Sequence, residues 1–105
     1  MIVIDKRCRR ELESFPLPVR EDLADAVARL EEGHLLSMPL SRPMPSIGLG
    51  VHELRLRDRS GGFRVVYVIV RAGEVHLVHA FQKKTRATPQ RSIEIARQRI
   101  RELRR

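Results

Sequence analysis

Basic residues recur at strand spacing in the second half of the chain, where they could stabilise negative charge on a phosphate. Arg55 and Arg57 are two residues apart on one predicted strand, so their side chains share a face. Arg64 begins the next strand, just across a turn. Lys83 and Lys84 directly follow a third predicted strand. In an antiparallel meander, the end of the first strand, the start of the second and the end of the third lie side by side. We therefore expect these cations to converge at one edge of the sheet.

Convergent cations in a concavity suit the scission of RNA by its own 2′-hydroxyl group. That reaction passes through a phosphorane with extra negative charge, which preorganised Arg and Lys groups stabilise. Arg also binds a phosphate through two parallel hydrogen bonds. The reaction needs a general base and a general acid. Glu53 could be the base if it points into the site, and Lys83 or Lys84 could be the acid if neighbouring cations lower its pKa. The same cations could instead form only a solvated surface or a docking patch for a protein partner.

Other chemistries find little support in the sequence. The chain has four histidines and one cysteine, Cys8, which lies on an apolar helical stripe and is expected to be buried and structural. His76 and His79 fall on opposite faces of a predicted strand. The glycines of Ser60–Gly62 connect two strands and do not open a helix, so they do not form a phosphate-binding loop. We therefore expect no metal and no cofactor.

Composition is consistent with a small basic domain that binds a polyanion. The 105 residues are enough for one domain, 1–105, and carry 21 Lys and Arg against 13 Asp and Glu, a formal net charge of +8. Such a surface attracts RNA, DNA, an anionic membrane or an acidic protein, although it could also serve solubility alone. Only four aromatic residues are present, so a broad base-stacking platform is not expected. The single cysteine and the lack of an apolar run of about 20 residues favour a cytoplasmic protein with no membrane partner.

The pattern of apolar residues predicts an α+β fold with two N-terminal helices, a small antiparallel sheet of three or four strands and one C-terminal helix. Residues 34–50 contain three prolines and are interpreted as a connector, or as a mobile flap beside a site. Thr88 is the expected N-cap of the last helix, with Pro89 in its first turn. The predicted elements are helices at 6–14 and from about 18 to 33, strands at 51–57, 63–71 and 74–81, a helix to about 103, and a possible edge strand at 2–4.

Four segments together resemble the RelE/ParE toxin superfamily, and within it the HigB-type, phage Gp49-like branch. They are Glu53–Arg57, Phe63–Tyr67, His79–Thr85 and Thr88–Arg97, and the resemblance covers roughly residues 8–103. It implies a RelE-like fold and ribosome-associated cleavage of messenger RNA. It also implies neutralisation by a cognate antitoxin, which in this branch usually carries a helix-turn-helix domain.

The resemblance also implies roles for individual residues. In RelE-like nucleases, basic residues before the turn, an arginine at the start of the next strand and a basic residue after the last strand act on the RNA. Some relatives add a C-terminal tyrosine or histidine, but here Gln90 lies near that place and the only tyrosine, Tyr67, is in mid-strand. Tyr67 is expected to pack, or to present its hydroxyl at the rim of the site. The resulting assignments are Arg55, Arg64, Lys83, Lys84 and Glu53 as catalytic residues, and Arg57, Arg59, Tyr67 and Arg86 as RNA-binding residues.

The hypothesis that follows is a toxin of a type II toxin–antitoxin system that acts as a metal-independent, ribosome-dependent endoribonuclease. One alternative is a non-enzymatic, ParE-like toxin that blocks DNA gyrase, which would need no site for a phosphorane. Another is a non-toxic RNA-binding module, which would bind RNA in a salt-dependent way without cleaving it.

Overall fold

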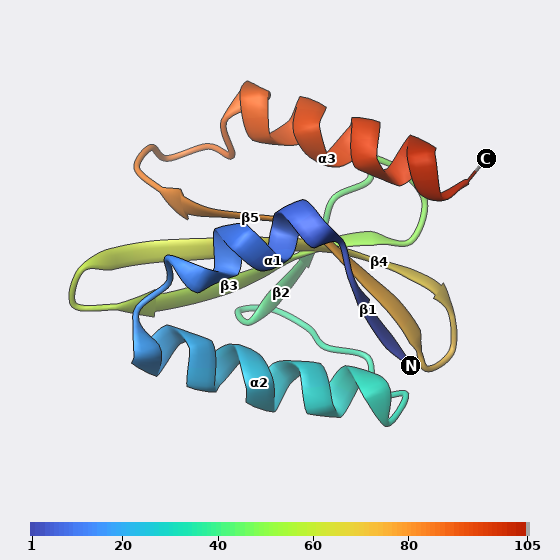
Figure 1. Ribbon diagram of the computed structural model, residues 1–105, viewed down its shortest axis with the longest axis horizontal. Helices are drawn as coiled ribbons and strands as arrows, with labels where there is room; N and C mark the ends of the chain where they lie inside the picture. Colours follow the sequence, from blue (N-terminus) through green and yellow to red (C-terminus); the bar gives the residue numbers. More distant parts are fainter. Residues whose placement is uncertain (105) are drawn as a thin grey trace.

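The computed structural model describes residues 1–104 and contains one five-stranded sheet with three helices (Figure 1). In the sheet, the strand order is β1-β5-β4-β3-β2. Strand β1 pairs with β5 in parallel, and every other pairing is antiparallel. Within the described residues, no helix has the length and apolar character needed to cross a membrane. The elements are β1 (Ile2–Ile4), α1 (Lys6–Glu13), α2 (Leu17–Glu31), β2 (Ser41–Pro43), β3 (Val51–Asp58), β4 (Gly61–Arg71), β5 (Glu74–Lys83) and α3 (Gln90–Leu103).

Helices cover both faces of the sheet, with α1 and α2 on one side and α3 on the other (Figure 1). Strand β4 is central and contributes to both cores, because its side chains alternate between the faces. Phe63, Val65 and Tyr67 pack with α1 and α2, whereas Val66 and Val68 pack with α3. The continuous apolar run of this strand is thereby explained, because both of its faces are buried.

The α+β class and the three helices are confirmed, and the sheet is larger than expected. The edge strand at residues 2–4 exists as β1. The stretch 34–50, predicted as a connector or flap, contains the additional strand β2. Three residues ending in a proline are too few to give a period-two pattern, and their pairing with β3 is visible only once the chain has folded back.

The first residues of α1 and α3 are capped in different ways. The Asp5 side chain caps α1 by accepting hydrogen bonds from the backbone amides of Arg7 and Cys8, at 2.8 Å and 3.2 Å. The expected N-cap role of Thr88 is wrong, because Pro89 occupies the cap position of α3 without a side-chain hydrogen bond. The Thr88 hydroxyl donates instead to a carboxylate on β3, 35 positions away along the chain.

Candidate active site

The register of three adjacent strands brings the predicted cations to one face of the sheet. Arg64 on β4 lies directly opposite Arg55 on β3. Two residues earlier on β4, Gly62 lies between Arg57 of β3 and Lys83 of β5. Side chains of directly paired residues, and of positions two apart, share a face. The predicted convergence is therefore confirmed as geometry, on the face that α3 covers only further along the strands.

Glycine at position 62 leaves room for the central cation. A Cβ atom added there would lie 3.3 Å from Nη1 of Arg64, which is closer than an ordinary contact. The Arg64 guanidinium therefore lies over Gly62, toward the β3–β4 turn. Its Nη1 donates to the carbonyl oxygen of Phe63 at 3.0 Å. The site is thus built around an arginine whose direction is fixed by the strand that carries it.

Glu53 is the acidic partner of Arg64 and is almost completely buried, with 1% of its surface exposed. Its Oε1 atom lies 3.6 Å from Nε of Arg64, and its Oε2 accepts a hydrogen bond from Thr88 Oγ1 at 2.8 Å. A carboxylate enclosed in this way cannot reach the 2′-hydroxyl of a bound RNA. The assignment of Glu53 as general base is therefore corrected. Glu53 instead orients Arg64, and its hydrogen bond with Thr88 fixes the segment before α3.

The electrostatics of the cluster are dominated by cations. Burial lowers the pKa of Arg64, as do Arg55, Arg57 and a further arginine, Arg42, while Glu53 opposes them. The guanidinium nevertheless stays charged at neutral pH, since the ordinary pKa of arginine is above about 12. A phosphate that enters would meet several positive groups with a single carboxylate among them.

Lys83 and Lys84 differ in a way that the sequence does not reveal. Lys83 ends β5 on the same face as Arg64 and is half-buried. Desolvation lowers its pKa first, followed by the charge of Arg64, while Glu53 acts in the opposite direction. Lys84 lies beyond the last strand residue and is exposed. Lys83 is therefore the lysine that belongs to the cluster.

A cleft of about 480 Å³ opens beside Arg64, on the side of β3. Its wall combines basic and apolar groups, and Leu56 contributes to a neighbouring hollow of about 320 Å³ that continues toward α2. The cleft is lined by Pro39, Leu40, Arg55, Leu56, Arg57, Gly62 and Arg64. This combination of a narrow basic wall and an apolar wall suits a nucleotide, which has an anionic phosphate and a flat base.

Three of the predicted RNA-binding residues lie outside this cleft. Arg59 is exposed in the β3–β4 turn, and Arg86 is exposed in the segment between β5 and α3. Tyr67 lies on the opposite face, 1% exposed, and its hydroxyl is hydrogen-bonded to Ser41 Oγ at 2.6 Å. An RNA contact by Tyr67 is therefore wrong. The alternative expectation, that it packs, agrees with its place in the core between the sheet and α1 and α2.

Two residues of the site were not found from the sequence. Arg42 of β2 lies opposite Glu53 and is exposed on the same face as the cluster. It was hidden because β2 itself was not predicted. Thr88 was assigned to a helix cap, although its hydroxyl contacts Glu53. The Thr88-Pro89 pair correctly indicates that a helix begins nearby. It does not reveal that the Thr88 hydroxyl binds Glu53 and not the backbone of that helix.

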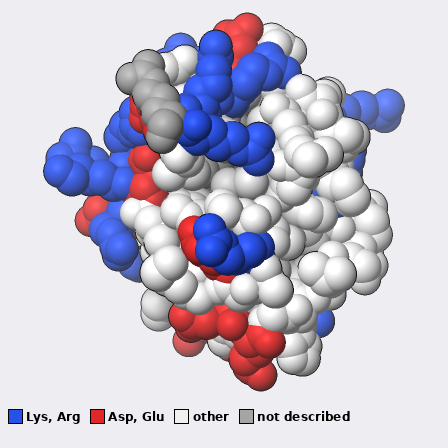
Figure 2. Space-filling model, turned by 90° about the vertical axis from the view of Figure 1, so that its right-hand side faces the viewer, with Lys and Arg blue, Asp and Glu red and all other residues white. Residues whose placement is uncertain are grey.

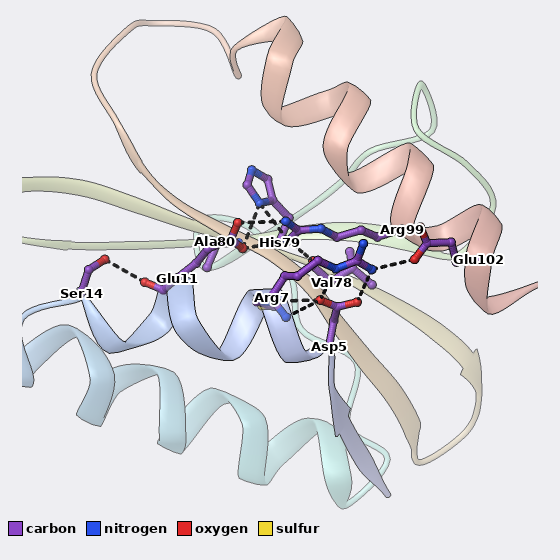
Figure 3. A network of polar contacts seen from close by, with 10 residues as sticks. Asp5, Arg7, Glu11, Ser14, Val78, His79, Ala80, Arg99 and Glu102 are labelled. Atoms are coloured by element: carbon purple, nitrogen blue, oxygen red, sulfur yellow. Dashed lines mark hydrogen bonds and ion pairs between the residues drawn. The ribbon is translucent and has the colours of Figure 1, made fainter.

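A second polar network joins α1, β5 and α3, on the side of the sheet away from the cleft (Figure 3). The carboxylate of Glu11 accepts hydrogen bonds from Nδ1 of His79 at 3.0 Å, the backbone amide of Ala80 at 3.1 Å and Nη1 of Arg99 at 2.9 Å. The same Arg99 nitrogen donates to the carbonyl oxygen of Val78 at 2.9 Å. Strand β1 pairs only with residues 75–77 of β5, so these side chains take over the hydrogen bonding of the edge beyond it. The network fixes α3 on the sheet.

The opposite end of the molecule has a different character. Figure 2 shows the side that bears the β4–β5 turn and the last turn of α3, where a broad area without Lys, Arg, Asp or Glu adjoins basic groups above and acidic groups below. Leu49, Val70 and Leu103 are exposed and line a hollow there. The strand cations Arg55, Arg57, Arg64 and Lys83 therefore lie at the other end of the sheet, beside the β3–β4 turn.

Two comparisons with known proteins agree with this description. The fold is that of the RelE-like toxins, since the free form of an Escherichia coli RelE toxin carrying two arginine-to-alanine substitutions superposes with a TM-score of 0.50. The alignment covers 98% of this chain and 96% of that chain at 19% sequence identity. The family model of phage-derived Gp49-like proteins (DUF891) matches residues 10–101, so the chain belongs to the Gp49-like family. The resemblance to the RelE superfamily is thereby confirmed. A search of curated proteins found no match.

Proposed function

We propose that this protein is the toxin of a type II toxin–antitoxin pair and that it cleaves messenger RNA on the ribosome. The observation that carries the proposal is the cluster of cations around Arg64, where three adjacent strands place basic side chains over Gly62 beside an open cleft. Glu53 is the one carboxylate paired with Arg64, so the cluster beside the cleft carries excess positive charge. The family and the RelE-like fold support the same function.

In the proposed reaction, Arg64 binds the scissile phosphate and stabilises the phosphorane that forms when the 2′-hydroxyl attacks. Arg55, directly opposite Arg64 on β3, binds the phosphate oxygens on the side of the cleft. Lys83, whose pKa is lowered by burial and by Arg64, protonates the leaving 5′-oxygen. Because no side chain that lines the cleft accepts a proton, the 2′-hydroxyl proton leaves to water.

Glu53 acts through Arg64 in this scheme. Its buried carboxylate opposes rotation of the Arg64 side chain and holds Thr88, and so the segment that leads from Lys83 to α3. Loss of the charge at position 53 should lower the rate of cleavage without removing a group that touches the RNA. The antitoxin partner and the cytoplasmic setting follow from the same proposal.

The test is messenger RNA cleavage by purified protein on translating ribosomes, followed by mapping of new 5′ ends. We expect Arg64→Gln to lower the rate by about 10²- to 10³-fold, the usual effect of removing one donor to a developing anion. Arg71→Gln is the matched control, because Arg71 ends the same strand and lies exposed at the opposite end of the sheet. Both variants must unfold at the same urea concentration as the wild type.

Two results would contradict the proposal. One is growth arrest on induction without new 5′ ends, which would point to a protein target such as DNA gyrase. The other is full cleavage by Arg64→Gln, which would place the reaction elsewhere on the molecule.

A further inference from the structure

The polar side chains that line the cleft beside Arg64 are all hydrogen-bond donors. They are Arg55, Arg57 and Arg64, and arginine has five N–H groups and no acceptor. The remaining lining residues are three apolar ones and a glycine. The cleft therefore favours a ligand that carries hydrogen-bond acceptors on a flat and largely apolar ring.

From this lining we propose that the cleft binds the nucleobase next to the scissile phosphate and selects guanine. The inference rests on the proposed function and names the substrate preference of the same site. Guanine presents two adjacent acceptors, N7 and O6, which one guanidinium binds with two parallel hydrogen bonds. Adenine presents N7 beside an amino donor, cytosine presents an amino donor, and uracil presents a single acceptor on that edge.

The three arginines are placed for different tasks. Arg64 is buried and directed by Phe63 O and Glu53, so it is the phosphate ligand. Arg55 is half-buried, and its Nη1 contacts Sδ of Met38 at 3.7 Å. Arg57 is exposed, and among residues 1–104 no carboxylate forms an ion pair with it. Arg57 is therefore the guanidinium that is available to read the edge of a base.

The apolar wall supplies the surface against which the base lies. Most of this wall comes from Pro39 and Leu40, in the segment before β2, because Leu56 is 4% exposed and adds only a small area. The Leu40 carbonyl oxygen accepts a hydrogen bond from the Arg55 amide at 2.8 Å, which holds this segment against the edge of β3. No aromatic ring lines the cleft, so the base is held between aliphatic side chains and a guanidinium plane, a recognised mode of binding unstacked bases.

Binding of 3′-mononucleotides measured by NMR tests the inference directly. We expect 3′-GMP to bind about tenfold more tightly than 3′-AMP, 3′-CMP or 3′-UMP, with shifts of the Leu40 and Leu56 methyl signals. Arg57→Met should remove the preference for 3′-GMP and retain binding of the phosphate. Arg59→Met is the matched control, because Arg59 is equally exposed in the adjacent turn and does not line the cleft. Inorganic phosphate should shift the Arg64 signals and leave the two leucines unchanged.

The outcomes separate this inference from the proposed function. Equal affinity for the four nucleotides, or a preference that survives Arg57→Met, would overturn the guanine pocket. Messenger RNA cleavage by the wild type without enrichment of guanine beside the new ends would also overturn it, while the proposed nuclease would stand. A guanine preference in binding that Arg57→Met removes, in a protein that cleaves no RNA, would support the pocket and sink the nuclease.

Discussion

Removing the Glu11 carboxylate should destabilise the protein more than removing any other charged side chain of α1. The side chain is 26% exposed and serves as acceptor for Arg99, whose side chain is 11% exposed, and for His79, 5% exposed. It also accepts the Ala80 amide at the edge of β5. In Glu11→Ala, the guanidinium and the amide lose their acceptor at a site that water reaches only partly.

The size of the effect follows from that burial. Removing one partner of a buried ion pair costs about 3–5 kcal/mol, because the other charge is left uncompensated. Partial exposure of Glu11 allows some rehydration, so we expect a loss of about 2–3 kcal/mol for Glu11→Ala. Glu11→Gln retains one oxygen acceptor and should cost about 1–2 kcal/mol. A small domain has a free energy of unfolding of about 5–15 kcal/mol, so the larger loss is easily measured.

Urea denaturation followed by circular dichroism gives the free energy of unfolding of each variant. Glu13→Ala is the matched control, since Glu13 lies on the same helix and is exposed, and it should change stability by less than about 0.5 kcal/mol. A double-mutant cycle with Arg99→Met should show that the two changes are strongly non-additive. If Glu11→Ala unfolds at the same urea concentration as Glu13→Ala, the network in Figure 3 does not hold α3 on the sheet.

Three further predictions concern the core and its titration. Tyr67→Phe removes the buried hydrogen bond to Ser41 and should cost about 1–2 kcal/mol in urea unfolding while messenger RNA cleavage is unchanged; a loss of cleavage would return Tyr67 to the site. Gly50→Ala should cost at least about 1–3 kcal/mol, because φ is +73° and the new Cβ would lie 2.8 Å from a backbone carbonyl oxygen of β4; equal unfolding midpoints would refute this. Burial lowers the pKa of His79 and of His52, so the unfolded chain takes up protons first and the free energy of unfolding should fall as pH drops below about 6.5. His79→Gln should flatten that fall below about pH 6.5, and an unchanged slope would show that His79 does not titrate differently in the folded state.

The arrangement of Arg55, Arg57 and Arg64 could be predicted because short turns connect their strands. A hairpin fixes which strands are neighbours, and the period of two fixes which side chains share a face. Lys83 was placed near them by the same reasoning, and the choice between Lys83 and Lys84 depended on where β5 ends. That end is set by pairing with β4, which the local pattern does not specify to one residue.

The role of Glu53 depends on its burial, which the sequence pattern does not show. The pattern put Glu53 on the same face as the arginines and left open whether it reaches solvent. In the folded chain, Thr88 returns to that part of β3 and donates a hydrogen bond to the buried carboxylate. Arg42 belongs to the cluster only because β2 pairs with β3 across a loop that has no periodic pattern.

The sequence by itself therefore determined the class of fold, the meander of three long strands and the face on which the cations lie. These depend on the alternation of side chains and on short connections, which are local properties of the chain. The tertiary structure alone decided that Glu53 is buried, that Arg42 joins the site and that Glu11 meets Arg99 over 88 positions of sequence. Such contacts depend on how distant segments return to the sheet, and each polar group takes the partner that burial brings within reach.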